Sequence, residues 1–191
     1  DRIVSLRDYE DVARAFAGIG TAQATIVWNG SRELLHLTVT DPSGNPAPAS
    51  TLSKLRDAIE AARDPGRPVC LEAADVKTFS LQAGLLIDPA YARPAVEDAV
   101  RVALAGAFAF ATRELGQPVT AAEVTTVIQS VAGVLAVDLD FLYLGSKPVL
   151  KAVLTAERAR YGAGSAGCAA ILPAQLLLLN PNGITLKEIA P

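Results

Sequence analysis

The sequence predicts an α+β fold with two tandem, small α/β-sandwich domains of ferredoxin-like character, each with an antiparallel sheet, and a C-terminal β-hairpin. Segments with helical and with strand periodicity follow one another in two successive groups. The 191 residues are 51% hydrophobic and 19% charged, which is enough apolar material for real cores and too little charge for a disordered chain. An Asn-Pro-Asn-Gly turn signal separates two apolar runs near the end.

The first group predicts a domain over residues 1–75. Its expected elements are a helix, two strands, a helix and a strand, at about 6–17, 21–28, 33–40, 51–62 and 69–74. Ser5 is a suitable N-cap for the first helix, and Asn29-Gly30-Ser31 is a strong hairpin signal between the two strands. The alternation of Leu35, Leu37 and Val39 predicts that one face of the second strand points inward.

The second group predicts a domain over residues 76–145. A strand at 77–87 precedes a long helix at 94–115, which Pro94 begins and Gly116-Gln-Pro118 ends. A second helix follows Thr120, which forms a capping-box pattern with Glu123, and an alternating run at 134–144 predicts the last strand.

The remaining residues divide into a connection and a tail. Residues 146–172 are rich in Ala and Gly and predict a flexible connection. Residues 173–191 predict the hairpin, and its four consecutive leucines indicate a strand covered on both faces, packed on the second domain or on a partner.

Charge and composition exclude several classes of protein. A net charge of −3 provides no basic field for nucleic acid, and no stretch approaches the 18 uncharged apolar residues of a membrane span. Two cysteines without CxxC spacing exclude a disulfide scaffold and zinc-ribbon chemistry. The chain begins with Asp1 and contains no Met, so we expect a fragment of a longer protein, and no signal peptide is visible.

The candidate catalytic residues all have structural interpretations. His36 lies in a predicted strand, Cys70 is expected in the core and Cys168 at the surface, and neither cysteine has an activating neighbour. Asp138 and Asp140 point to one face of a strand, which favours a solvated face over a metal site. We therefore predict no catalytic site, metal or cofactor.

Three further features have both a functional and a structural interpretation. The run Gly162–Gly167 lacks the Lys-Ser/Thr that follows a phosphate-binding loop. Arg56, Arg63 and Arg67 are too few to form a nucleic-acid groove. Trp28, the sole tryptophan, fits core or edge packing and also fits an interface anchor.

The order of several short phrases resembles the C-terminal part of baseplate assembly proteins, the J-like wedge proteins of contractile phage tails and phage-tail-like contractile injection systems. The phrases are Asp88-Pro-Ala-Tyr91, Ala107-Phe-Ala-Phe-Ala111, Gly116-Gln-Pro-Val119, Val131-Ala-Gly-Val134 and Ala136-Val-Asp-Leu139. The segment Arg2–Ala13 resembles the family's entry into its first repeat, and Pro173–Asn180 with Gly183–Leu186 resembles its end.

The resemblance implies a structural role without enzymatic activity. It implies a wedge subunit that is assembled in the bacterial cytoplasm, forms a hetero-oligomeric ring around the hub, and links to the sheath through other baseplate proteins. Apolar strand residues would then form the interface, and we predict that it contains Trp28, Leu176, Leu177, Leu178, Leu179, Ile184 and Leu186. We expect charged residues at positions 177 and 179 to abolish assembly.

Two functions from other classes stay open. Tandem α+β units also serve as regulatory modules that bind a small molecule, for which a polar pocket would be the mark. A hydrolase that uses Cys168 or His36 is the third possibility, and it predicts loss of activity on Cys168→Ser.

Overall fold

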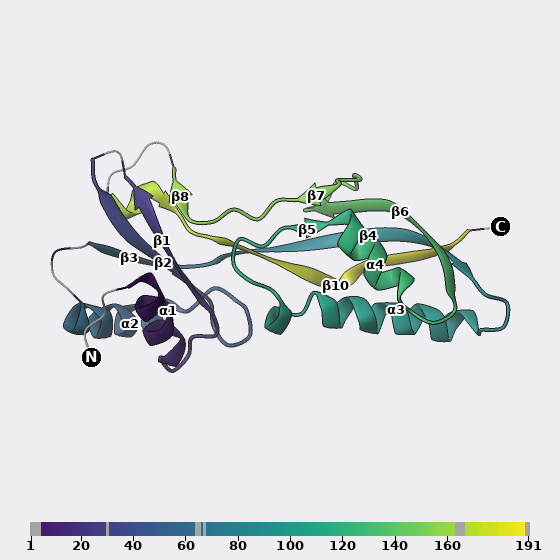
Figure 1. Cartoon of the computed structure of the whole chain (residues 1–191), viewed down its shortest axis with the longest axis horizontal. Helices are drawn as coiled ribbons and strands as arrows, with labels where there is room; N and C mark the ends of the chain where they lie inside the picture. The colour runs from purple at the N-terminus through teal and green to yellow at the C-terminus, as the bar shows by residue number, and fades with distance from the viewer. Residues whose placement is uncertain (1–4, 30, 64–65, 67, 163–166, 190–191) are drawn as a thin grey trace. The chain divides into compact units, whose positions relative to one another are not determined.

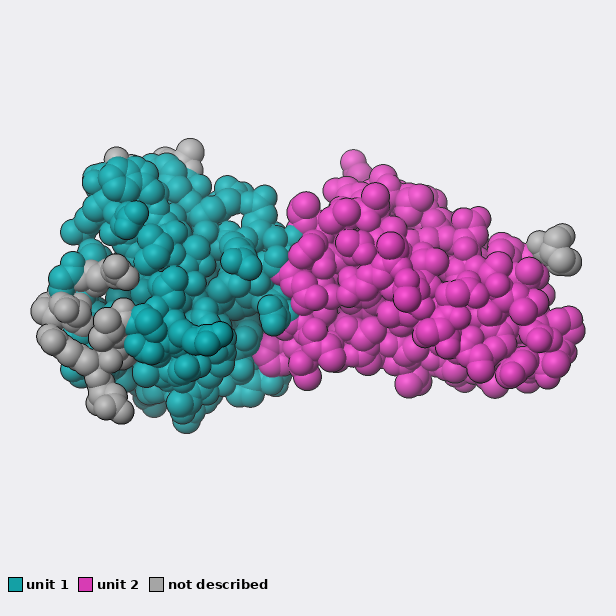
Figure 2. All heavy atoms as spheres, viewed as in Figure 1, with its two compact units in different colours: residues 1–76, 114–116, 156–176 teal, residues 77–113, 117–155, 177–191 magenta. Residues whose placement is uncertain are grey.

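The computed structural model describes residues 5–29, 31–63, 66, 68–162 and 167–189 (Figure 1). They divide into two compact units, coloured separately in Figure 2. Unit 1 contains residues 1–76, 114–116 and 156–176, and unit 2 contains residues 77–113, 117–155 and 177–191. The first boundary lies beside the predicted one, but the chain returns to unit 1 after most of unit 2 has been formed.

Unit 1 contains the predicted order of helix, strand, strand, helix and strand. The elements are α1 (Leu6–Ala15), β1 (Ala22–Trp28), β2 (Glu33–Val39), α2 (Ala49–Ala62) and β3 (Val69–Ala73). Ser5 caps α1 as predicted, because its hydroxyl accepts a hydrogen bond from Asp8 N at 3.1 Å while the Asp8 carboxylate accepts one from Ser5 N at 2.8 Å.

The sheet of unit 1 has the order β1-β2-β3 and is mixed. Strands β1 and β2 are antiparallel, whereas β2 and β3 are parallel, so the expectation of an antiparallel sheet is wrong here. The reason is the connection: α2 carries the chain back to the end of the sheet at which β2 began, so β3 runs in the same direction as β2.

Both faces of this sheet are buried. On one face, Leu35, Leu37 and Val39 pack against α1 and α2, in a cluster with Tyr9, Ala13, Leu55 and Ile59. On the other face, Val27, Leu34 and Cys70 pack against Ala159 and Ile171. Every residue from Leu34 to Val39 is therefore buried, including His36 and Thr38, whereas the alternating pattern predicted only one inward face.

The cover of the second face comes from residues 156–176, which we call the return segment. It contains β8 (Arg160–Tyr161), η2 (Gly167–Ala170) and β9 (Ile171–Leu172), and β8 and β9 form an antiparallel ribbon. The sequence predicts a flexible connection over 146–172, yet Ala159, Ala170 and Ile171 are buried. Residues 163–166, within the Gly162–Gly167 run, lie outside the described residues.

Unit 2 contains the predicted order of strand, helix, helix and strand. Its elements are β4 (Asp75–Ile87), which begins in unit 1, α3 (Arg93–Ala107), η1 (Phe110–Thr112), β5 (Val119–Thr120), α4 (Ala121–Gln129), β6 (Val134–Leu144) and β7 (Val153–Leu154). Strand β6 has the predicted bounds. Strands β4 and β6 pair antiparallel, and the buried residues Phe79, Leu81, Ala83 and Leu85 alternate along β4.

Two local details of unit 2 differ from the expectation. Helix α3 ends at Ala107 rather than near residue 115, and the Thr112 hydroxyl donates to the Ala107 and Ala109 carbonyls at 2.9 and 2.8 Å. The hydroxyl of Thr120 accepts from Glu123 N at 3.0 Å, but the Glu123 carboxylate binds Arg113 at 2.8 Å instead of completing a capping box.

The C-terminal residues form strand β10 (Gln175–Glu188), which lies in a sheet of order β10-β4-β6. The predicted turn Asn180–Gly183 lies within this strand, where Asn182 N donates to Asn180 Oδ1 at 3.1 Å. A Cβ at Gly183 would lie 2.3 Å from Ser80 Oγ, so glycine permits the close approach of β4. The α+β class is confirmed, whereas the ferredoxin-like arrangement of the two domains is not.

Candidate interaction surface

Trp28 is the most exposed aromatic side chain of unit 1 among the described residues, at 58%. It is the last residue of β1, an edge strand, and lies opposite Glu33. Alternation along β1 places it on the same face as Ala24 and Ile26, which pack against the helix-side core. Trp28 continues that apolar face beyond the core, an arrangement typical of an interface anchor.

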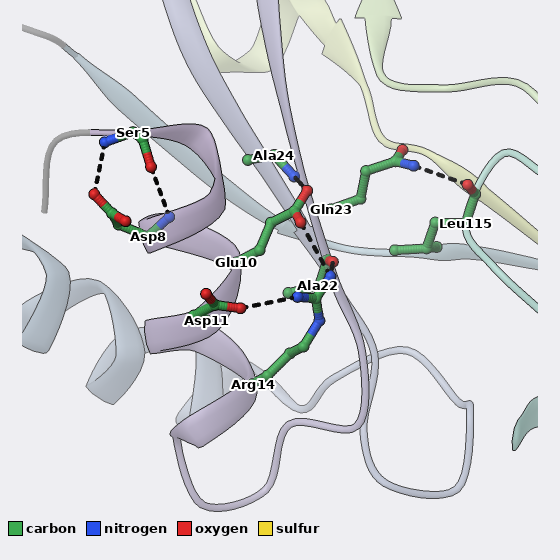
Figure 3. A network of polar contacts seen from close by, with 9 residues as sticks. All are labelled: Ser5, Asp8, Glu10, Asp11, Arg14, Ala22, Gln23, Ala24 and Leu115. Carbon is green, nitrogen blue, oxygen red and sulfur yellow. Dashed lines mark hydrogen bonds and ion pairs between the residues drawn. The ribbon is translucent and has the colours of Figure 1, made fainter.

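At the other end of β1 from Trp28, side chains of α1 bind the backbone of the strand edge (Figure 3). Glu10 Oε1 accepts from Ala24 N at 2.9 Å, and an Arg14 terminal nitrogen donates to Ala22 O at 3.0 Å. The same Arg14 nitrogen lies 3.0 Å from the Glu10 carboxylate. These side chains occupy backbone groups that an added strand would need, so strand addition is blocked at Ala22 and Ala24.

Most of the other predicted interface residues lie inside the protein. Leu176, Leu177, Leu179 and Ile184 are 0%, 1%, 9% and 8% exposed, whereas Leu178 and Leu186 are half-buried. The four leucines thus belong mainly to the chain's own core, because Leu176, Leu177 and Leu179 are buried and Leu178 is half-buried.

His36 is fully buried beneath the return segment. Its Nδ1 lies 3.2 Å from Thr38 Oγ1, which also accepts a hydrogen bond from Ala174 N at 3.1 Å. Burial lowers the pKa of His36 to about 4, so the ring is neutral at pH 7. Its Nε2 lies 3.7 Å from the Glu72 carboxylate without a hydrogen bond, and burial raises the pKa of Glu72.

The two cysteines are joined in a disulfide, which the sequence analysis missed. Cys70 on β3 and Cys168 in η2 have Cα atoms 5.4 Å apart, across a sequence separation of 98. Cys70 lies in the core as predicted, and Cys168 is exposed. No local signal could have revealed the pair, because its proximity depends on the return of residues 156–176 to unit 1.

Asp138 and Asp140, which the sequence places on one strand, differ in their surroundings. Asp140 lies at a register shift between β4 and β6 and accepts a hydrogen bond from Gln82 at 3.0 Å, while Asp138 is exposed. The described residues contain no group of three or more His, Cys, Asp or Glu side chains that could hold a metal ion.

The predicted arginine cluster serves structural contacts. Arg56 donates to Leu71 O at 3.3 Å, and Arg63 lies 2.7 Å from the Glu60 carboxylate. Arg67 lies outside the described residues.

A hollow of about 340 Å³ lies in unit 1 along the return segment. Its lining includes Arg160 paired with Glu157, and Gln175 bonded to Asp75 at 3.1 Å. These polar groups are engaged with one another, so the hollow offers no convergent set of groups for a ligand.

Comparisons with known proteins find a family model and a solved structure to which parts of the chain are similar. Residues 1–72 match the family model described as the Baseplate J-like central domain. The fold is similar to that of a chain in the cryo-EM structure of the anti-feeding prophage (AFP) baseplate, 6-fold symmetrised, with a TM-score of 0.66 and 10% sequence identity. The match covers 94% of this chain and 38% of that chain.

A search of curated proteins finds no match. Among the described residues, no helix is long and apolar enough to cross a membrane. The resemblance to baseplate J-like proteins is confirmed, and it rests on residues 1–72, which are similar to the Baseplate J-like central domain.

Proposed function

We propose that this chain is a structural part of a baseplate wedge subunit in a contractile injection system or phage tail. The observation that carries the proposal is the match of residues 1–72 to the Baseplate J-like central domain. In this proposal the chain assembles around the hub in the bacterial cytoplasm. It forms a hetero-oligomeric ring with other wedge proteins and links to the sheath, and it catalyses no reaction.

The construction of unit 1 supports a structural role. Its sheet is buried on both faces, and part of its edge is occupied by Glu10 and Arg14. Several polar side chains that the sequence singled out make structural contacts, among them His36 with Thr38 and Asp140 with Gln82. A subunit that transmits force within a ring needs rigid bodies with specific contact surfaces, and these features provide rigidity.

The interface proposal now rests on Trp28, with contributions from the half-buried Leu178 and Leu186. Leu176, Leu177, Leu179 and Ile184 are buried and are no longer proposed as contact residues. Charged residues at positions 177 and 179 would therefore disturb the fold before they tested an interface.

The experiment is assembly of the full chain with a candidate partner wedge protein, measured by light scattering coupled to gel filtration. We expect a heteromeric species with the unchanged chain and a markedly weaker complex with Trp28→Ala. Tyr161→Ala is the matched control, because Tyr161 is an aromatic residue of unit 1 that is 45% exposed and outside the predicted interface. Equal complex formation by the two variants would remove Trp28 from the interface, and no complex with any wedge protein would refute the proposed function.

A further inference from the structure

The disulfide joins two cysteines in very different surroundings. Cys70 is 1% exposed and lies in the apolar cluster between the sheet and the return segment. Cys168 is exposed in η2. These are the two cysteines of the 191-residue sequence.

The return segment is held on the sheet by contacts that do not involve sulfur. Ala159 and Ile171 are buried in the cluster, and Ala174 N donates to Thr38 Oγ1 at 3.1 Å. Gly162 N donates to Ala170 O at 2.6 Å, across the segment that contains Cys168. None of these contacts requires the Cys70–Cys168 bond, so we expect them to hold Cys168 near Cys70 when both are thiols.

We propose that Cys168 and Cys70 form an oxidation-dependent latch, in which Cys168 reacts with a small disulfide such as glutathione disulfide and Cys70 completes the bond. Cys168 is the residue that the oxidant can reach. Cys70 lies in apolar surroundings, where a thiolate is unfavourable and an outside disulfide has no access.

The chemistry has two exchange steps. First, the Cys168 thiolate attacks one sulfur of glutathione disulfide, which forms a mixed disulfide and releases one glutathione thiolate. Cys70, losing its proton, then attacks Sγ of Cys168. The Cys70–Cys168 bond forms and a second glutathione thiolate leaves. The two protein thiols are thereby oxidised by two electrons, and one glutathione disulfide is reduced to two thiols.

The consequence is a covalent attachment of the return segment to β3. When the two cysteines are reduced, the return segment can open from the sheet by breaking noncovalent contacts alone. His36 and Thr38 lie beneath this segment. In the oxidised form, Cys168 stays attached to Cys70 during such an opening, so the cover of the second face is more persistent. This inference does not depend on the proposed baseplate function.

The test treats the reduced full chain with glutathione disulfide, stops the reaction with acid at intervals, and follows the intact mass. We expect a transient adduct of one glutathione, followed by a product that has lost two hydrogens. Cys70→Ser is expected to accumulate the adduct at Cys168. In the folded state, Cys168→Ser is expected to react with glutathione disulfide at least about tenfold more slowly than Cys70→Ser. In denaturant, the two variants should react at the same rate.

Equal rates for the two folded variants would overturn the assigned order of attack. A stable adduct on the unchanged chain without closure to the disulfide would overturn the latch. Hydrogen exchange supplies an independent readout: the amides of Gly162 and Ala174 should exchange faster in the reduced than in the oxidised chain. Identical amide exchange in the reduced and oxidised chains would also overturn the latch. Circular dichroism of each variant verifies that the comparison is made on folded protein.

Discussion

Acidification should destabilise unit 1 through His36. The ring is fully buried, and burial lowers its pKa from 6.5 to about 4. Between these two values the unfolded chain binds a proton that the folded chain does not bind. The free energy of unfolding therefore decreases as the pH falls through this window, and His36 has no such effect above it.

The magnitude follows from the size of the pKa shift. The pKa of about 4 lies about 2.5 below 6.5, which at about 1.4 kcal/mol per pKa unit gives a full loss of about 3.5 kcal/mol. About 3 kcal/mol of it falls between pH 6.5 and pH 4, because the titration is only half complete at each end of this window. Because His36 is 0% exposed, solvent screening does not reduce this value greatly. An ion pair between protonated His36 and Glu72, whose nearest atoms are 3.7 Å apart, would reduce it.

Glu72 acts in the opposite direction. Burial raises the pKa of its carboxyl, while the charge of Arg56 lowers it. A carboxyl with a raised pKa contributes stability at low pH that is lost as the pH rises through its folded pKa. The pH dependence of the whole protein therefore mixes the two groups, and a variant is needed to separate them.

The assay is urea unfolding from pH 7 to pH 4, comparing the unchanged chain with His36→Gln, which cannot take up the proton. Carrying Glu72→Gln in both chains removes the opposing carboxyl. As the pH falls from 7 to 4, we expect the chain with His36 to lose about 3 kcal/mol more unfolding free energy than the His36→Gln chain. Parallel curves for the two chains would refute the reasoning.

The remaining predictions concern the core and the buried charges. Under oxidising conditions, Cys168→Ser should lower the free energy of unfolding by about 2–4 kcal/mol, because the disulfide closes a long loop, and added reductant should abolish the difference from the unchanged chain. Leu177→Ala should cost about 2–5 kcal/mol in chemical unfolding, since its side chain is 1% exposed, and an unaltered midpoint would contradict its place in the core. Arg113→Met removes the donors to Glu123 and to the Pro118 carbonyl and should lower the free energy of unfolding by about 1–3 kcal/mol. In a chain that already carries Glu123→Gln, the same substitution should cost less, because the ion pair is already absent; an equal cost would show that the ion pair contributes nothing.

Local features of the fold could be predicted from the sequence. The Ser5 cap, the bounds of the strand Val134–Leu144 and the order of elements in each group depend on neighbouring residues and periodicity, which the sequence displays directly. The end of α3 near Phe108 and the partner of Glu123 depend on Arg113 and Thr112, whose contacts arise only in the folded chain.

Features that depend on distant segments could not be predicted. His36 and Thr38 occupy alternate positions that suggest a solvated face, but the return segment covers them. The pairing of Cys70 with Cys168 and the parallel direction of β3 likewise follow from where the chain returns rather than from any nearby motif. The sequence shows that Trp28 and the leucines are all hydrophobic, but it does not show which of them are exposed. Only the folded structure distinguishes the exposed Trp28 from the buried leucines.

The return of residues 156–176 has a consequence for the order of synthesis. When residues 1–76 have left the ribosome, the helices can already cover one face of the sheet β1-β2-β3. The opposite face, with Leu34 and Cys70, has no native cover until the chain has also been synthesised through most of unit 2. A nascent chain that stops before residue 156 therefore displays an apolar sheet face to chaperones and proteases, and quality control would distinguish it from a chain that contains residues 156–176.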